Sequence, residues 1–318
     1  MSARNTIQAA VQRYLDERRR LGFDLAIAGG QLIRFARYAD ARGHEGPLTL
    51  ELQLGWAREH VLRTGPTTWA RRVEIVRPFA TYYRQFEPQS EVPESKTFGR
   101  GHRRLAPHIY TEQEICDLLD EAGRLTPKDG LRPLTYRTLL GLIAATGLRL
   151  SEALHLRDED VDLQGAQLTV RQTKFNKSRC LPLHPSVVRA LADYRLPREH
   201  IVARSLGMPF FVSPSGNELP SRTVENTFSR MRDRRGWRPR GEHPNLRIQD
   251  LRHSFATRRV QQWRAAGVPI DQAMFWLCTY LGHAKISDTY WYLTGVPELM
   301  SEIGARFEDF AYREIHHG

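Results

Sequence analysis

The sequence predicts a mainly helical protein with one small β-sheet, divided into two domains. Its 318 residues suffice for two domains of ordinary size. Apolar residues recur at helical spacing through both halves, whereas residues 166–173 and 179–183 alternate as short strands do. Between the halves, residues 88–107 are rich in Pro, Gly, Ser and charge, which is typical of a linker. We therefore expect domains at 1–87 and 108–318.

The first domain is expected to be a bundle of helices with basic outer faces. Apolar stripes predict helices near the N-terminus, around Leu32 to Ala39, from 49 to 60, and around Trp69 to Tyr83. Arginines occupy the opposite faces, which either face solvent or bind the backbone of DNA. The overall positive charge favours the DNA-binding interpretation. The candidate nucleic-acid-binding residues of the whole chain are Arg18, Arg19, Arg34, Arg71, Arg72, Arg103, Arg104, Lys177, Arg230, Arg234 and Arg235.

The second domain is expected to open on a capping box. Thr111 and Glu114 have the spacing of that motif, and an apolar stripe follows them. An apolar helix over 134–146 should end at Gly147, because glycine adopts the left-handed conformation of a helix C-cap. The segment KFNKS is expected to turn between the two strands. Further helices are expected at about 185–195, 221–235, 248–265, 269–281 and 297–312.

Composition narrows the class of protein. The formal charge is +11 and comes mostly from arginine, so a polyanion such as DNA or RNA is the expected partner. The 3 cysteines are far apart and form no CxxC pattern, which indicates neither a disulfide framework nor a zinc site. The N-terminal stretch is too charged for a signal peptide, and no apolar run reaches the length of a membrane span. We expect a cytoplasmic protein with no membrane partner.

Four separated segments carry the side chains that point to chemistry. They contain Arg149 in ATGLRLSEAL, Arg252 and His253 in IQDLRHSFAT, His283 in YLGHAKIS, and Tyr292 nine residues later. Taken singly, an arginine is usually a surface or ion-paired residue and a tyrosine usually packs in a core. In this order, however, the set resembles the catalytic core of the tyrosine recombinases, the phage-integrase family.

The resemblance extends over most of the chain. Its specific motifs span about 110–295, whereas residues 1–87 match the family in size, helicity and position. It implies a helical core-binding (SAM-like) domain followed by a mixed α+β catalytic domain over 108–318. It also implies double-stranded DNA sites as partners and a tetramer on DNA. The helix expected at 297–312 would dock either on a neighbouring protomer or on its own domain.

In the family, two arginines bind the non-bridging oxygens of the scissile phosphate. Arg149 and Arg252 occupy these positions and would neutralise the charge that builds up in the transition state. Glu152 lies three residues after Arg149, close enough on one helical turn to hold it in place. With two fixed guanidiniums, neither a metal nor another cofactor is needed.

The hairpin TKFNKSRCLPL resembles the family's β2–β3 turn, whose lysine protonates the departing 5′-oxygen. Lys174 occupies the family's position just before the turn, and Lys177 is the alternative. Such a role requires a lysine whose pKa is lowered by nearby arginines and by burial against DNA.

The family's nucleophile is a tyrosine nine residues after the histidine of its LGH motif. Tyr292 has this spacing from His283, while Tyr290 and Tyr280 are neighbouring alternatives. A phenol with a pKa of ~10 is a poor nucleophile unless positive charge stabilises the phenolate. The two arginines would supply that charge, and His283 would hydrogen-bond the phosphate or the leaving oxygen.

One position departs from the family. The usual His-x-Leu-Arg-His reads Gln249-Asp-Leu-Arg-His253 in this chain. Glutamine cannot titrate, but its amide can still donate a hydrogen bond to a phosphate oxygen. We expect Gln249 to bind phosphate without shuttling a proton, and His253 to pack on its helix and not to act as a substitute base.

The resemblance implies an enzyme that breaks and rejoins DNA. Tyr292 would attack a phosphate to give a 3′-phosphotyrosyl link and a free 5′-hydroxyl, so that strands exchange without metal or ATP. The alternatives are a type IB topoisomerase-like enzyme, a DNA-binding protein that has lost catalysis, and a basic helical RNA-binding protein, for which no RNA-module signature is found. Phage integration, dimer resolution and transposition are all compatible roles, and the arginine-rich segment 222–242 favours a mobile element.

Overall fold

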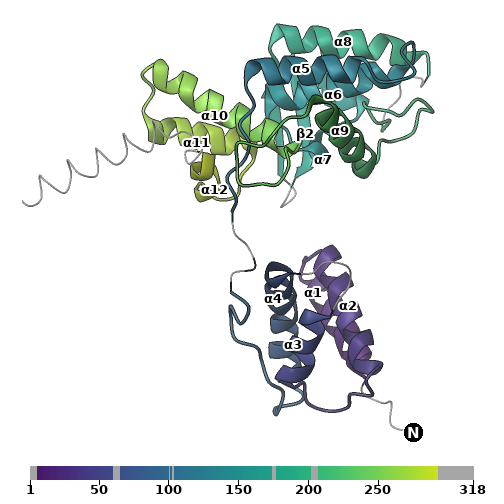
Figure 1. Cartoon of the computed structure of the whole chain (residues 1–318), viewed down its shortest axis with the longest axis vertical. Helices are drawn as coiled ribbons and strands as arrows, with labels where there is room; N and C mark the ends of the chain where they lie inside the picture. Colours follow the sequence, from purple (N-terminus) through teal and green to yellow (C-terminus); the bar gives the residue numbers. More distant parts are fainter. Residues whose placement is uncertain are drawn as a thin grey trace, which may run out of the picture. The chain divides into compact units, whose positions relative to one another are not determined.

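The computed structural model describes residues 6–59, 65–99, 101, 104–173, 177–201 and 207–292. The chain forms two compact units, Met1–Arg104 and Leu105–Gly318 (Figure 1). Helices dominate both units and the second also contains a small sheet, so the predicted fold class is confirmed. The helix expected at 297–312 lies outside the described residues.

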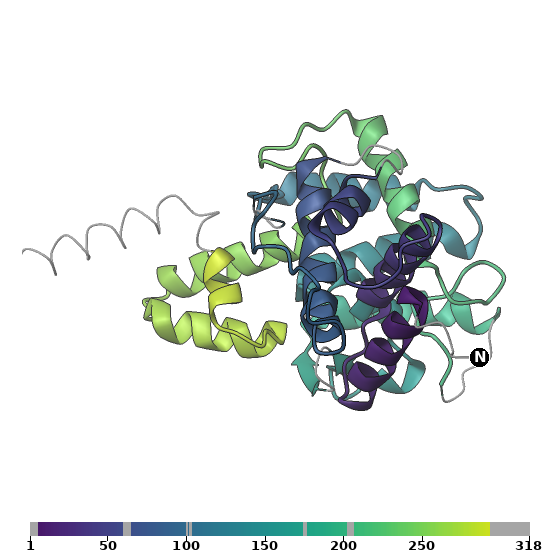
Figure 2. The same cartoon turned by 90° about the horizontal axis from the view of Figure 1, so that it is seen from below.

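The N-terminal unit is a bundle whose helices follow the predicted apolar stripes. These helices are α1 (Ile7–Arg20), α2 (Ala26–Asp40), α3 (Leu50–Arg58) and α4 (Pro66–Tyr83) (Figures 1 and 2). The side chains of Thr6 and Thr49 accept hydrogen bonds from the first turns of α1 and α3, which explains where both helices begin. Phe35 and Phe79 are fully buried between the helices and pack edge to face.

The chain after α4 packs back onto the same bundle. Glu91 donates its backbone N–H to the carbonyl of Leu48 at 2.8 Å, and Gln53 Nε2 donates to the carbonyl of Glu91, also at 2.8 Å. Phe98 meets the ring of Trp69 edge to face. The first part of the segment expected as a linker thus contributes to the core of the N-terminal unit.

The second unit begins with the predicted capping box. The Thr111 hydroxyl accepts from the N–H of Glu114 at 3.1 Å, and the Glu114 carboxylate accepts from the N–H of Thr111 at 2.8 Å. The helices of this unit are α5 (Glu112–Gly123), α6 (Leu131–Thr146), α7 (Leu150–Leu154), α8 (Pro185–Glu199), α9 (Ser221–Arg235), α10 (Gln249–Ala265), α11 (Ile270–Leu281) and α12 (Ser287–Tyr290).

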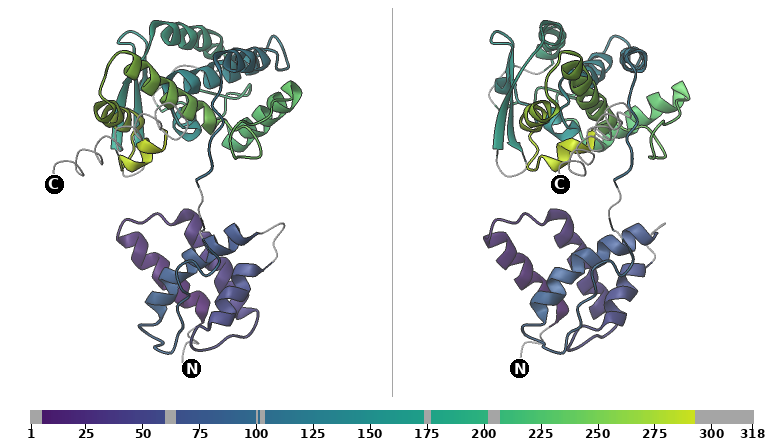
Figure 3. Two further views of the ribbon diagram at one scale, coloured as in Figure 1. Left: turned by 60° about the vertical axis from the view of Figure 1, so that its left-hand side comes forward. Right: turned by 90° about the vertical axis from the view of Figure 1, so that its left-hand side faces the viewer.

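The sheet is antiparallel, with the order β1-β2-β3. A short 3-10 turn, η1 (Asp158–Asp160), leads into β1 (Val161–Asp162), and the predicted hairpin consists of β2 (Gln167–Thr173) and β3 (Lys177–Pro182). In both views of Figure 3, this hairpin lies beside the segment that joins α11 to α12.

The unit has two apolar cores that meet along α10. Leu251 at the start of α10 belongs to the large core built on α6, whereas Phe255 and Val260 face Leu277 and Leu281 of α11. Figures 1 and 2 both show α10 and α11 side by side. Because α10 contributes to both cores, its first turn is fixed at the junction between them.

Gly147 ends α6 as predicted. Its backbone is left-handed, with φ 66°, and its N–H bonds the carbonyl of Ile143 at 2.8 Å. A β carbon at this position would lie 2.5 Å from Cδ1 of Phe255, so α10 packs where only glycine leaves room. The turn at Gly147 then leads directly to Arg149.

Replacing Gly147 should therefore cost more than backbone strain alone. Gly236 is a matched control, because it also ends a helix with positive φ (62°) but has nothing within 4 Å of its added β carbon. We expect Gly236→Ala to lose about 1 kcal/mol of unfolding free energy through left-handed strain. Gly147→Ala should lose about 1–3 kcal/mol more through overpacking, measured by urea denaturation. Equal losses in the two variants would contradict this account.

Candidate active site

Arg252 is the centre of the site and is almost fully buried, with 1% exposure. It lies in the first turn of α10. Its Nη1 donates to the carbonyl of Gly147 at 2.6 Å and its Nη2 to the carbonyl of Leu281 at 2.8 Å. These carbonyls belong to the ends of α6 and α11, where the helix dipole favours a cation. Arg252 therefore has a fixed orientation.

The other donors of Arg252 face the predicted nucleophile and histidine. Nε donates to the Tyr292 hydroxyl at 3.4 Å, and Nη2 lies 3.1 Å from Nε2 of His283. The Tyr292 hydroxyl is 3.5 Å from the same Nε2, and the two rings stack with centroids 5.7 Å apart. The structure thus brings together three residues that the sequence placed in separate motifs.

The surroundings of His283 define its protonation. A guanidinium can only donate, so Nε2 of His283 accepts from Arg252, and Nδ1–H donates to the Thr289 hydroxyl at 2.8 Å. Burial, followed by the charges of Arg252 and Arg149, lowers the pKa of His283 to about 4. At neutral pH the ring is uncharged, with Nε2 accepting from Arg252 at 3.1 Å and lying 3.5 Å from the Tyr292 hydroxyl.

The two alternative tyrosines are engaged elsewhere. Tyr290 donates its hydroxyl hydrogen to Asp271 at 2.8 Å, and burial together with this carboxylate raises the pKa of Tyr290. Tyr280 stacks on Phe255, and burial raises its pKa as well. Of the three tyrosines, Tyr292 alone has both Arg252 and His283 at its hydroxyl.

Arg149 is held by Glu152 as the spacing predicts. Its Nη1 donates to Oε1 of Glu152 at 2.7 Å, and its backbone N–H donates to Oε2 at 2.9 Å. The Arg149 side chain is 35% exposed, so this pair leaves it accessible to a ligand. Oε2 of Glu152 is also 3.7 Å from Nη1 of Arg252. One carboxylate thus connects the two predicted phosphate ligands.

A third arginine, which the sequence did not single out, binds the same carboxylate. Arg179 of β3 donates through Nη1 and Nη2 to the two oxygens of Glu152, at 3.1 and 2.9 Å. Burial alone would raise the pKa of Glu152, but Arg179, the Arg149 N–H and Arg252 lower it to about 2. The strand pattern held one signal, because Arg179 shares a face with the core residue Leu181 two positions on.

His253 packs against the nucleophile candidate. Its ring centroid is 5.2 Å from that of Tyr292, and its Nδ1 is buried with no hydrogen-bond partner among the described residues. Gln249, the first residue of α10, is partly exposed, and the described part of the chain offers its side chain no hydrogen bond. Lys174 lies outside the described residues, as does the side chain of Lys177.

Two of the arginines predicted to contact nucleic acid make internal contacts in the structure. Arg72 is 9% exposed, and its Nη1 donates to the carbonyls of Trp56, Ala57 and Glu59, so it caps the end of α3. Arg235 lies 3.4 Å from Glu121 and bonds the carbonyl of Asp117, which ties α9 to α5. Both arginines stabilise their own unit.

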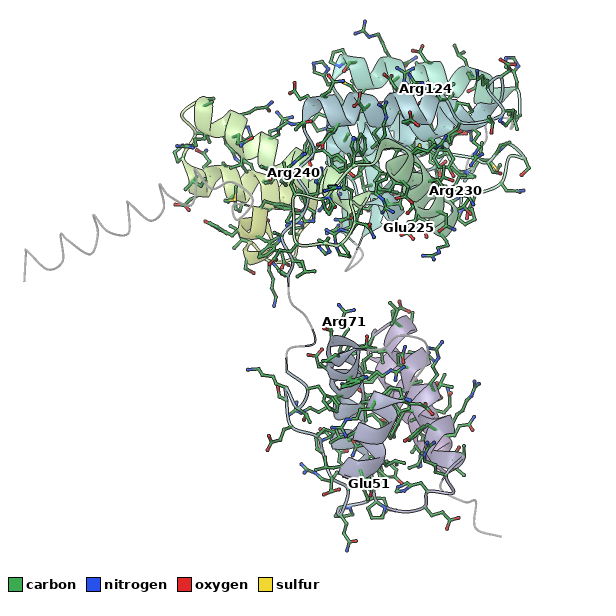
Figure 4. The ribbon with its side chains drawn as sticks, in the orientation of Figure 1. Glu51, Arg71, Arg124, Glu225, Arg230 and Arg240 are labelled. Carbon is green, nitrogen blue, oxygen red and sulfur yellow. The ribbon has the colours of Figure 1, made fainter. Side chains whose placement is uncertain are left out.

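The other basic candidates differ in exposure. Arg18 is partly exposed and lies over the rings of Tyr14 and Phe23. Arg71 and Arg230 project outward in Figure 4, although Arg71 also bonds the carbonyl of Gly101. The remaining exposed candidates are Arg19, Arg34, Arg104 and Arg234. Arg103 lies outside the described residues.

The described residues contain neither a membrane-spanning helix nor a cluster of metal-binding side chains. No helix in these ranges is long and apolar enough to cross a membrane. No group of three or more His, Cys, Asp or Glu side chains in the same ranges is arranged to hold a metal ion.

His253, which is buried beside Tyr292, should make the stability of the protein depend on pH. Burial, and then the charges of Arg247 and Arg252, lower the pKa of His253 from 6.5 to about 3. Between these values the unfolded chain binds a proton that the folded chain does not. The contribution of neutral His253 to the free energy of unfolding is therefore complete above the pKa that this residue has in the unfolded chain. It is lost as the pH falls below that value, by up to about 1.4 kcal/mol per pH unit.

The free energy of unfolding should fall as the pH is lowered from about 6 to about 4.5, and we expect His253→Phe to reduce this fall. In this range, carboxylates whose pKa is lowered do not yet bind protons. Phenylalanine keeps the ring contact with Tyr292 but cannot bind a proton. The control is His155→Gln, which changes an exposed histidine of the same unit. Urea denaturation at several pH values measures the effect, and an unchanged slope in His253→Phe would refute it.

Comparisons with known proteins agree with this geometry. Residues 109–296 match the model of the phage integrase family. A putative integrase/recombinase, y4rB of Sinorhizobium fredii, is 38% identical over 309 residues, which cover 96% of this chain and 98% of that protein.

Solved structures show the same fold. The integrase of the transposon Tn1549 in complex with transposon right end DNA superposes with a TM-score of 0.65 at 16% identity, covering 94% of this chain and 99% of that chain. The site-specific recombinase XerH bound to its difH substrate gives a TM-score of 0.64 at 18% identity, covering 87% and 78%. The matches do not favour a topoisomerase. The chain belongs to the phage integrase family and is a tyrosine recombinase, an enzyme that breaks and rejoins DNA.

Proposed function

We propose that this recombinase exchanges strands at specific double-stranded DNA sites through a covalent bond to Tyr292. One observation carries the proposal: the Tyr292 hydroxyl lies 3.4 Å from Nε of Arg252 and 3.5 Å from Nε2 of His283. Arg252 stabilises the negative charge that develops on the attacking and phosphate oxygens. The proximity of Tyr292 to Arg252 and His283 of the same chain supports cleavage by each protomer with its own tyrosine.

The first step is an in-line attack on the scissile phosphate. Arg149 and Arg252 bind its non-bridging oxygens, with Gln249 as a further amide donor. When Arg252 Nη2 turns its hydrogen bond from His283 to the phosphate, Nε2 of His283 becomes free to take the phenol proton, and a phosphotyrosyl bond forms as the bond to the 5′-oxygen breaks. Lys174 gives the departing oxygen its proton.

The second step reverses the first on a different strand. A 5′-hydroxyl from the partner duplex attacks the 3′-phosphotyrosyl link, which restores Tyr292 and joins the exchanged strands. The phosphodiester bond energy is retained throughout, so no ATP is consumed. The assembled side chains support an active enzyme over a DNA-binding protein that has lost catalysis, despite Gln249.

The assembly and biological role are also proposals. The N-terminal unit, whose helices lie within 1–87 and onto which the first part of 88–107 packs, would hold the DNA backbone through its exposed arginines, and the catalytic domain would span 108–318. Four protomers would act on two sites, with the segment 297–312 docking on a neighbour. The arginine-rich segment 222–242 supports a mobile element as the source, and action on DNA supports a cytoplasmic site.

The nucleophile can be tested without knowing the target site. Wild-type protein is incubated with a randomised duplex library, and covalent protein–DNA adducts are captured under denaturing conditions. The captured duplex then serves as the probe. Tyr292→Phe should bind this duplex with unchanged affinity and form no adduct, because the attacking oxygen is missing.

Tyr290→Phe is the control for this experiment. It removes only the hydroxyl that bonds Asp271, so its yield of adduct should equal that of the wild type. An adduct in Tyr292→Phe together with none in Tyr290→Phe would reassign the nucleophile to Tyr290.

Metal dependence provides a separate test. If Arg149 and Arg252 neutralise the phosphate, the rate of adduct formation should be the same in excess EDTA and in magnesium. Rates are compared on the captured duplex under single-turnover conditions. A strict requirement for a divalent cation would contradict the arginine mechanism.

A further inference from the structure

Glu152 is surrounded by three guanidiniums, and the proposed mechanism uses only two of them. Arg179 is the third, and it makes the most complete contact, with both Nη groups on both carboxylate oxygens. Its side chain is 12% exposed and that of Glu152 is 8% exposed. A buried bidentate pair of this kind fixes both side chains in one geometry.

Arg179 lies at the root of the β2–β3 turn. It pairs with Val170, and the register then shifts before the next pair, Thr173 with Lys177. Regular pairing therefore ends at Arg179. Because Leu181 is buried on the same face of β3, the Arg179 side chain is directed inward from the strand.

On its other side, Arg179 meets the turn that carries His283. Gly282 ends α11 with φ 67°, and a β carbon there would lie 2.8 Å from Nη1 of Arg179. Glycine meets both the conformation and the contact without displacing Arg179. Arg179 is thus held between the carboxylate of Glu152 and the backbone next to His283.

The contact between Arg179 and Glu152 also affects Arg149 and Arg252, because all three arginines share the negative charge of Glu152. A buried carboxylate must be paired, and the guanidinium of Arg179 binds both oxygens of Glu152, whereas that of Arg149 binds one. Without Arg179, the same negative charge would have to be balanced by the two remaining arginines. Their donors would then be drawn toward Glu152 and away from an incoming phosphate.

We propose that Arg179 is a positioning residue for cleavage. By occupying Glu152 it leaves donors of Arg149 and Arg252 for the phosphate, and by packing on Gly282 it supports the turn that presents His283. This inference rests on the proposed function, in which those three residues act on the scissile phosphate.

A double-mutant cycle separates this role from a general loss of structure. On the captured duplex, Arg179→Ala should slow adduct formation by about 10–100-fold, the size typical of a lost supporting contact, with little change in DNA affinity. In a Glu152→Gln background there is no negative charge for Arg179 to neutralise. Arg179→Ala should therefore slow cleavage in that background by less than about 3-fold. Equal losses in both backgrounds would overturn the proposal that Arg179 acts by occupying Glu152.

Two further variants complete the set. Arg179→Lys should recover part of the rate, since an ammonium can balance Glu152 but cannot bind both of its oxygens in parallel. Arg171→Ala is the control, because Arg171 is an exposed arginine of the same hairpin that pairs with Asp160. It should cleave at the wild-type rate. If Arg179→Ala does not fold, Arg179→Lys is compared in the two Glu152 backgrounds instead.

Hydrogen exchange tests the packing on Gly282 without DNA. In Arg179→Ala, amide exchange at Gly282 and His283 should accelerate by at least about 10-fold relative to the wild type and to Arg171→Ala. Unchanged exchange at both residues would overturn the proposed support of this turn. If the wild type forms no adduct with any duplex, the proposed function fails, whereas this measurement still decides whether Arg179 holds the turn.

Discussion

The site depends on one buried cation, the guanidinium of Arg252. A charged group with 1% exposure is tolerated only when its donors are hydrogen-bonded and its charge is balanced. The carbonyls of Gly147 and Leu281 accept two of its hydrogen bonds, and Glu152 lies 3.7 Å away. Since those carbonyls end α6 and α11, a single side chain joins the termini of two helices to the start of a third. Tyr292 and His283 then take their positions from a guanidinium that cannot easily move.

Arg149 and His283 each follow a turn that ends a helix, and both turns are built in the same way. Gly147 ends α6 with φ 66° and Gly282 ends α11 with φ 67°. A left-handed glycine stops each helix sharply, which exposes the last carbonyls to Arg252 and places a functional residue within the next two positions. A side chain in either position would also collide with a neighbour, so each turn is constrained by tertiary packing as well as by backbone conformation.

Local signals made much of this arrangement predictable. Apolar periodicity located most of the described helices, and short-range rules identified the capping box at Thr111, the end of α6 at Gly147 and the pairing of Glu152 with Arg149. The two-residue β1 and the four-residue α12 are too short to produce a periodic pattern. The role of Arg179 could not be predicted in this way. Its partner, Glu152, lies 27 residues earlier in the chain, and the two residues meet only when the sheet has folded.

The arginines that give the chain its net charge of +11 fall into two groups, buried and exposed, with different physical roles. Inner arginines, such as Arg252, Arg179 and Arg72, bind carbonyls or a shared carboxylate, and their contribution is geometric. Outer arginines, such as Arg34 and Arg230, face solvent, where salt screens their attraction to a polyanion. A count of basic residues consequently overstates the number of phosphate contacts. Loss of an outer arginine should weaken DNA binding in a salt-dependent way, whereas loss of an inner one misplaces groups and is felt at any ionic strength.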